Sequence, residues 1–150
     1  MRQNLTLWEK ALSEVLNQAV KFDESDVFLA EIEQQLINFH YQDTVLIIFA
    51  CAGQLENQQQ ATALLQANCF WQGTKGATFS TMDDGTIVLA LQCRIQNKAN
   101  LNQLLTDYLI TLNYWSHRLL CDLSLPKENA PQKLQTTKAE SKRWLSIDLI

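Results

Sequence analysis

The chain has 150 residues, 47% of them hydrophobic and 19% charged, so it can bury one ordinary core without disulfides or a metal. Its net charge is -4, and no Lys or Arg occurs between Phe22 and Thr74, which argues against a surface for nucleic acid phosphates. The longest apolar run is far too short to span a membrane, and the first residues lack the pattern of a signal peptide. We therefore expect one soluble, intracellular domain.

A helix is predicted first. The capping box Thr6-x-x-Glu9 indicates its start, because the hydroxyl and the carboxylate can each satisfy a free backbone N-H at a helix end. Apolar residues then recur at helical spacing and form a broad stripe that must pack against the rest of the fold. The stripe consists of Trp8, Ala11, Leu12, Val15, Leu16 and Ala19.

Three strands are predicted next. Residues 27–33 and 36–41 are short β-prone runs, and the second alternates apolar and polar side chains, as a half-buried antiparallel strand does. Residues 45–50 are apolar on both faces, so we place them in the middle of the sheet. The joints at 34–35 and 42–43 are too short for anything but hairpins.

A second helix follows the strands. Gly53 is expected to end the third strand, and Asn57-x-x-Gln60 is expected to cap a helix that runs to about Phe70. The outer face of this helix is polar but uncharged, so it is easier to bury against another subunit than a charged face. Trp71 follows Phe70 directly, and two adjacent rings at a helix end cannot both face inward.

A hairpin and a long helix complete the domain. The alternating runs 77–82 and 86–95 flank the sequence Asp-Asp-Gly at 83–85, which is a strong hairpin signal. A third helix is expected to begin at Asn97 or Asn100 and to lie across the sheet, because it is long and carries an apolar stripe. The stripe consists of Leu101, Leu104, Leu105, Tyr108, Leu112, Trp115 and Leu119. The prediction is therefore an α+β fold, α-β-β-β-α-β-β-α, with an antiparallel sheet packed by helices.

The C-terminal part differs in composition from the rest. Residues 124–137 contain both prolines and have no periodicity, so we expect the domain to span 1–123 and to be followed by a linker. Residues 138–150, KAESKRWLSIDLI, combine three basic residues with five large apolar ones. Such a segment either docks on its own domain or is a recognition segment for a partner.

Residue patterns for catalysis or metal binding are few. A Gly-rich phosphate loop, a Gly-x-Ser-x-Gly motif and a His-Glu-x-x-His motif are all absent from the sequence. Local spacing places no carboxylate or nucleophile beside His40 or His117, the two histidines. Glu31 and Glu33 share a strand face but are too few for a cation site. We predict no catalytic residue, no metal and no cofactor.

The four cysteines do not change this conclusion. They are widely spaced and form no Cys-x-x-Cys pair, which favours neither a zinc site nor a redox pair. Reduced, packed thiols are the simpler interpretation. The cysteines are Cys51, Cys69, Cys93 and Cys121.

One stretch resembles a known family. It contains Leu64-Leu65-x-Ala67-Asn68, then Gly73, Gly76, Ala77 and Phe79, then Asp84-Gly85 before Ile87-Val88-Leu89. This order is similar to that of the class I type III secretion chaperones, the Tir-chaperone-like family. The resemblance implies a homodimer in the bacterial cytoplasm that holds the N-terminal chaperone-binding segment of a secreted effector in extended form, without ATP hydrolysis. The resemblance also makes a secretion ATPase or the export machinery a candidate partner. It implies neither nucleic acid binding nor membrane insertion.

The resemblance also implies site residues. The family's dimer contact carries over to Leu64, Leu65, Asn68, Ala77 and Phe79. Its effector grooves carry over to Trp8, Leu12, Val27, Leu29, Ile37 and Phe39. Residues 138–150 are not part of the family's common core. Because this segment is basic and apolar and the groove-bearing half is acidic, we hypothesise that it occupies an effector site until it is displaced.

Two other interpretations stay open. The chain could be a stand-alone regulatory or protein-stabilising module of the same fold outside secretion. It could also be a small enzyme or ligand-binding domain with a cleft under the third helix. The neighbouring gene distinguishes them, since a secretion chaperone typically lies beside the gene of its effector.

Overall fold

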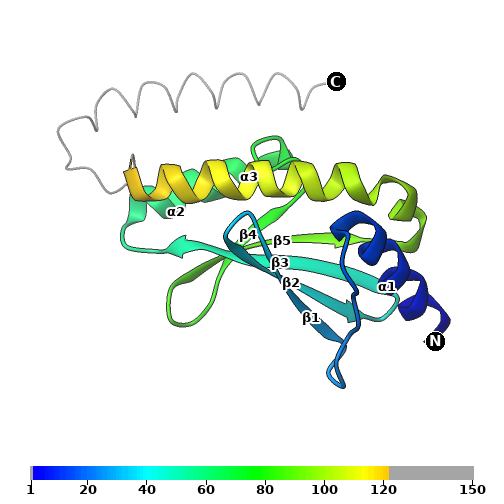
Figure 1. The fold of residues 1–150 in the computed structure, drawn as a ribbon. Coiled ribbons are helices and arrows are strands. Elements are labelled where there is room, and N and C mark those ends of the chain that lie inside the picture. The colour runs from blue at the N-terminus through cyan, green and yellow to red at the C-terminus, as the bar shows by residue number, and fades with distance from the viewer. Residues whose placement is uncertain (1, 122–150) are drawn as a thin grey trace, which may run out of the picture.

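The computed structural model describes residues 2–121, which form a five-stranded antiparallel sheet with three α-helices (Figure 1). The elements are α1 (Arg2–Leu16), β1 (Val27–Ile32), β2 (Gln35–Gln42), β3 (Val45–Gln54), α2 (Gln58–Asn68), η1 (Cys69–Trp71), β4 (Thr78–Thr81), β5 (Thr86–Cys93), η2 (Ile95–Asn100) and α3 (Leu101–Cys121). The predicted α+β order is confirmed. The predicted linker at 124–137 and the segment at 138–150 lie outside the described residues.

The strands lie in the order β1-β2-β3-β5-β4, and each neighbouring pair is antiparallel. β3 pairs with β2 and β5, so its predicted place in the middle of the sheet is confirmed. The first two hairpin turns are centred on Glu33-Gln34 and Asp43-Thr44, one residue away from the predicted joints. All four residues have positive φ, as a two-residue type I′ turn requires.

Two predicted boundaries are wrong. α1 begins at Arg2, so Thr6 lies inside the helix and does not cap it. The Glu9 carboxylate accepts a hydrogen bond from the backbone N-H of Phe22 at 3.1 Å, and this contact holds the chain that returns from α1. β3 continues through Gly53 to Gln54, with a register shift between Cys51 and Gly53. Gly53 therefore forms a β-bulge in the strand and does not end it.

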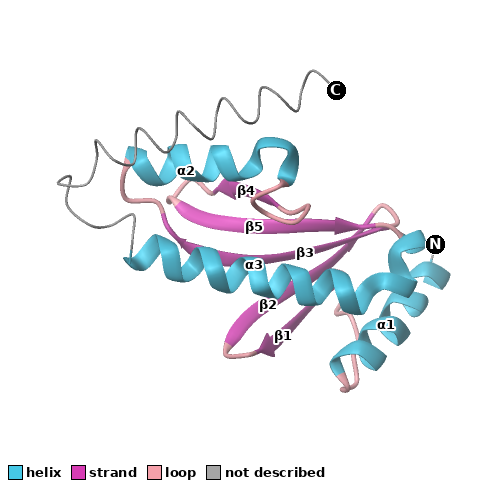
Figure 2. Ribbon diagram, turned by 90° about the horizontal axis from the view of Figure 1, so that it is seen from above, coloured by secondary structure: helices cyan, strands magenta, loops and turns pink. Residues whose placement is uncertain are grey.

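The helices lie on one side of the sheet (Figure 1). α3 runs across the strands, with α2 near β4 at one edge and α1 beside the other end of α3 (Figure 2). The predicted stripe of α3 faces the sheet, and its buried members are Leu101, Leu105, Tyr108, Leu112, Trp115 and Leu119. The Tyr108 hydroxyl donates to the carbonyl of Leu89 at 2.7 Å, and burial raises the pKa of this phenol. This hydrogen bond fixes α3 against β5.

Cys93 provides a test of the core. Burial raises the pKa of its thiol to about 11, whereas Cys51 and Cys121 are exposed. At about pH 8 we expect an alkylating reagent to modify Cys51 and Cys121 in the folded protein and to leave Cys93 intact, since the thiolate is the reactive species. Mass spectrometry after timed labelling measures this difference. Labelling in denaturant is the control and should modify Cys93 as well; equal rates in the folded protein would contradict this placement.

Candidate functional site

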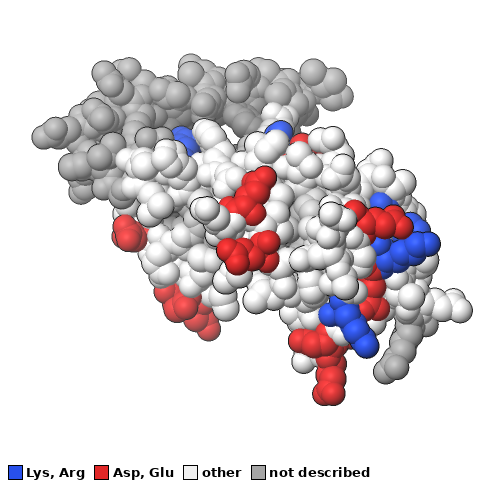
Figure 3. Space-filling model, viewed as in Figure 1, with Lys and Arg blue, Asp and Glu red and all other residues white. Residues whose placement is uncertain are grey.

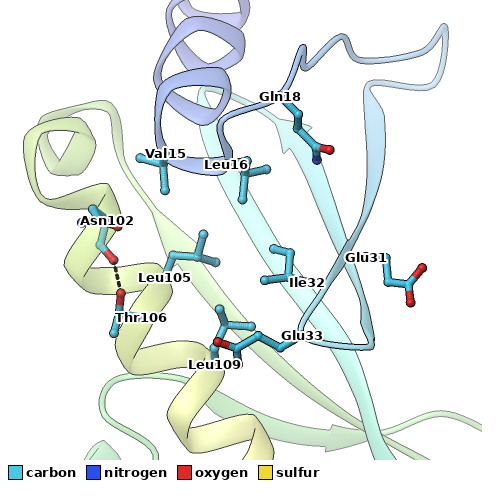
Figure 4. Close-up of a pocket in the computed structure, with 10 residues that line it drawn as sticks. All are labelled: Val15, Leu16, Gln18, Glu31, Ile32, Glu33, Asn102, Leu105, Thr106 and Leu109. Carbon is cyan, nitrogen blue, oxygen red and sulfur yellow. Dashed lines mark hydrogen bonds between the residues drawn. The ribbon is translucent and has the colours of Figure 1, made fainter.

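A groove with a volume of about 340 Å³ lies between the end of α1, the β1–β2 turn and the first half of α3. Five apolar side chains line it: Val15, Leu16, Ile32, Leu105 and Leu109. Figure 4 shows these side chains converging from the two helices and from the end of β1. The other lining residues are polar: Gln18, Glu31, Glu33, Asn102 and Thr106. The groove is therefore suited to an apolar side chain whose polar or basic neighbours stay near water.

Local hydrogen bonds position the walls of the groove. Asn17, directly after α1, has φ of 54°, so the chain turns away from the helix axis at this point. Asn113 of α3 accepts from the Gln35 amide at 2.5 Å and donates to the Glu33 carboxylate at 3.4 Å. These contacts tie the β1–β2 turn to α3, so the two sides of the groove are held by the fold itself.

Negative charge lies at the border of the groove, where Glu33 points toward Leu109 and Glu31 points away from the groove (Figure 4). Glu31 and Glu33 are both exposed, and no described cation lies within ion-pair distance of either carboxylate. The ion pair among the described side chains joins Lys75 to Asp107 at 3.6 Å. On the face shown in Figure 3, acidic groups lie over the middle and lower parts of the molecule, and larger basic groups lie at the side of α1. A basic ligand segment would meet no competing internal cation at Glu31 or Glu33.

β1 borders the groove and forms one edge of the sheet, because β2 is the one described strand with which it pairs. At its start, the Val27 carbonyl accepts from the Asp23 backbone N-H at 3.0 Å. Beyond that point the outer edge of β1 presents backbone groups that can pair with another strand. The edge strand thus offers main-chain hydrogen bonds beside an apolar groove.

The opposite face of the sheet is apolar and carries no helix in the described part of the chain (Figure 1). Alternation along β1, β2, β3 and β5 assigns side chains to this face, which we call the outer face. Its larger apolar members are Val27, Leu29, Leu36, Ile47, Phe49 and Val88. Leu29 is 53% and Leu36 is 60% exposed, so the outer face near β1 is open to contact.

Burial separates the six predicted effector-binding residues into two groups. Trp8, Leu12, Ile37 and Phe39 are fully buried in the protomer's own core, which argues against direct contact with a partner. Val27 is half-buried and Leu29 exposed, both on the outer face. This division has a simple cause, since apolar periodicity identifies the buried face of a helix or strand and not a groove beside it.

Sequence reasoning missed the groove itself. Val15 and Leu16 belonged to the predicted stripe of the first helix, and Leu105 to that of the third. Their convergence depends on the crossing of α1, α3 and the β1–β2 turn, which no local pattern encodes. The signal that the sequence offers for this region is the pair of carboxylates at Glu31 and Glu33, which by themselves indicate at most a cation site.

The five predicted dimer residues are also divided by burial. Leu64, Ala77 and Phe79 are buried within the protomer, and Leu65 is 70% exposed. The Asn68 side chain donates to the Phe79 carbonyl at 3.0 Å and accepts from the Phe79 N-H at 2.7 Å. Asn68 is thus engaged inside the protomer, and Leu65 is the residue of this set that presents large apolar surface.

Two aromatic residues extend the surface around Leu65. Phe70 and Trp71 are 49% and 54% exposed, and both have positive φ, which is uncommon for bulky residues. The Trp71 indole N-H donates to the Thr78 hydroxyl at 3.0 Å and so holds the ring beside β4. Residues 57–74 contain no charged side chain. We call Leu65, Phe70 and Trp71 the α2 patch.

Neither a metal centre nor a membrane span is found among the described residues. Within residues 2–121, His, Cys, Asp and Glu do not gather in groups of three that could hold a metal ion. None of the helices in this part combines the length and apolar character that crossing a bilayer requires.

The fold is shared with solved structures of type III secretion chaperones. One is from the Yersinia pestis chaperone SycH in complex with a fragment of YscM2, with a TM-score of 0.61 and 19% identity over 75% of this chain and 98% of that chain. Another is from the HopA1-SchA chaperone-effector complex, with a TM-score of 0.65 and 14% identity over 78% of this chain and 98% of that chain. A third is from the ExoT-SpcS complex of Pseudomonas aeruginosa, with a TM-score of 0.60 and 20% identity over 76% of this chain and 98% of that chain.

The sequence settles the family. The model of the Tir chaperone protein (CesT) family matches residues 10–116, so the chain belongs to that family. A comparison with curated protein sequences gives no match.

Gly73 provides a test of the packing beneath the α2 patch. A Cβ at this position would lie 2.9 Å from the Ala67 Cα, and the Gly73 carbonyl accepts from the Trp115 indole at 3.0 Å. We expect Gly73→Ala to lower the free energy of unfolding by about 1–3 kcal/mol, because the backbone of α2 must move. Urea denaturation measures the change, with Gln72→Ala at the exposed neighbour as control. Equal stability of the two variants would contradict the close approach.

Proposed function

We propose that the protein is a type III secretion chaperone that binds the N-terminal region of a secreted effector in extended form and acts as a homodimer in the bacterial cytoplasm. Family membership and the similarity to solved structures, which include a chaperone-effector complex, support this proposal. The observation that carries it is the position of β1, an open edge strand with an apolar groove on one side and the apolar outer face on the other.

The geometry suits an extended ligand. A segment that pairs with the edge of β1 would alternate its side chains between the two faces of the sheet. Those on one side would enter the groove near Ile32, and those on the other would lie beside Leu29 and Leu36. Main-chain hydrogen bonds would give affinity for any extended segment, and the spacing of apolar side chains would give specificity.

Apolar burial supplies the driving force. Covering a Leu side chain fully is worth about 1.5–3 kcal/mol, and Leu29 and Leu36 are each more than half exposed. The ordering of the captured segment offsets part of this gain. Glu31 and Glu33 favour a segment that carries Lys or Arg beside its apolar residues. Binding of this kind breaks no covalent bond, so the proposal assigns no catalytic residue and no cofactor.

The α2 patch suits a second copy of the chain. Leu65, Phe70 and Trp71 are large, exposed and surrounded by uncharged side chains, so their burial costs little desolvation. Aromatic anchors of this kind are enriched at protein interfaces. The proposed dimer contact is therefore the α2 patch, with the buried residues Leu64, Ala77 and Phe79 supporting it from below.

Effector binding can be tested on the outer face. We expect Leu29→Asp to weaken binding of the effector encoded beside the gene by at least about tenfold, since it places a charge where apolar side chains would pack. Calorimetry with the N-terminal region of that effector measures the affinity. Gln92→Asp is the matched control, on the same face but three strands from β1. Equal effects of the two substitutions, or no complex with the unmodified protein, would refute the proposed site.

The dimer can be tested separately. We expect the unmodified chain to have twice the mass of 17.2 kDa in solution, and Leu65→Asp with Trp71→Asp to give a folded protein of 17.2 kDa. Light scattering after size exclusion measures the mass, and circular dichroism checks folding. Gln96→Asp, at an exposed position on η2, is the control and should remain dimeric. A monomeric unmodified protein would refute the proposed homodimer.

A further inference from the structure

The groove matches a segment of this chain. We propose that residues 138–150 bind in the groove between α1 and α3 and compete there with the effector segment. The docking stands on the geometry of the groove, and the competition rests on the proposed function. The C-terminal segment would thus act as an internal occupant that an effector must displace.

The chemistry of segment and groove is complementary. The segment KAESKRWLSIDLI contains five large apolar residues, which are Trp144, Leu145, Ile147, Leu149 and Ile150. The groove offers apolar side chains from both helices and from β1. Lys142 and Arg143 directly precede Trp144. Glu33 lines the groove and Glu31 lies at its border, and neither carboxylate meets a described cation (Figure 4). Exposed ion pairs contribute little affinity, so apolar burial would hold the segment and charge would orient it.

The distances also fit. Leu105 lies 16 residues before Cys121 on α3, which corresponds to about 24 Å at 1.5 Å per residue. Sixteen residues, 122–137, separate Cys121 from Lys138. A chain of this length reaches roughly 50 Å when extended and has a root-mean-square length of about 20–24 Å as a random coil. Effective concentration is highest when this length matches the span, and it is then on the order of millimolar.

The segment lies outside the part of the chain that the family model matches. The family match ends at residue 116, and the similar structures described above cover 75–78% of this chain. The residues that line the groove, from Val15 to Leu109, all lie within the matched range of 10–116. Residues 138–150 thus lie outside the matched domain that contains the groove.

The expected size of the competition follows from the effective concentration. A segment with an intrinsic Kd of about 0.1 mM would fill about nine-tenths of the grooves at an effective concentration of about 1 mM. Effector affinity would then fall by about tenfold relative to a chain whose segment cannot dock. A weak contact is therefore enough to regulate the site.

Docking can be tested without an effector. Methyl NMR spectra of the full chain and of Trp144→Asp with Leu149→Asp should differ at Val15, Leu16, Ile32, Leu105 and Leu109. Methyl groups of Val88 on the outer face should stay unchanged. Gln132→Asp in the predicted linker is the control. Shifts confined to the outer face, shifts that depend on protein concentration, or none at all would overturn the proposal.

A charge exchange tests the orientation of the segment. Glu31→Lys with Glu33→Lys should weaken docking and move the groove signals part of the way toward those of the Trp144→Asp with Leu149→Asp variant, because like charges would then face each other. Adding Lys142→Glu and Arg143→Glu should restore the signals of the unmodified chain. Failure to restore them would overturn the assigned pairing of Glu31 and Glu33 with the segment.

Competition is measured last, with the N-terminal region of the effector encoded beside the gene. The Trp144→Asp with Leu149→Asp variant should bind it about tenfold more tightly than the unmodified chain. Groove shifts with unchanged effector affinity would overturn the competition and leave the docking. Absence of effector binding by every variant, with groove shifts present, would instead refute the proposed function.

Discussion

The packing of α3 across one face of the sheet is the constraint on which the rest of the structure depends. Its buried stripe, from Leu101 to Leu119, together with the hydrogen bond from Tyr108 to Leu89, holds the helix against β3 and β5. Every helix of the described chain lies on that face, so no described helix covers the apolar side chains of the other face. Asn113 on the same helix forms hydrogen bonds to Gln35 and Glu33 and so holds the β1–β2 turn against α3. The groove lies beside this contact. Core and binding surfaces are thus consequences of a single helix placement.

The surfaces that follow from this placement differ in chemistry and so in suitable partners. The groove is concave, apolar and acidic at Glu31 and Glu33, which suits a basic and apolar segment. The α2 patch is aromatic and lies in a stretch without charge, which suits a copy of itself. β1 and β4 are the two edges of the described sheet. The sheet therefore holds the groove beside β1 and the α2 patch beside β4 at a fixed distance from each other. One chain can therefore take part in two kinds of association without their contacts overlapping.

Much of the fold could be predicted from the sequence, and less of the site. Alternation and helical spacing gave the strands, the stripe of α3 and the cap of α2, where the Asn57 side chain accepts from the Gln60 N-H as expected. The capping box at Thr6 failed because Glu9 bonds to Phe22 instead, a contact between residues 13 apart. Trp8, Leu12, Ile37 and Phe39 were assigned to a binding surface because an apolar side chain looks alike in sequence whether it faces a core or a ligand. The groove needed the relative positions of three elements, and those are set by tertiary packing.

Asn68 has a consequence for how many strands the sheet can accept. Its carboxamide pairs with both backbone groups of Phe79 that point away from β5, so the rim at β4 is already satisfied by a side chain. Under the proposed function, strand addition would be directed to the opposite rim, at β1, and each protomer would accept one strand. A symmetric homodimer would present two such β1 edges to one effector chain. The distance between the two edges would set the length of the shortest effector segment that can pair with both.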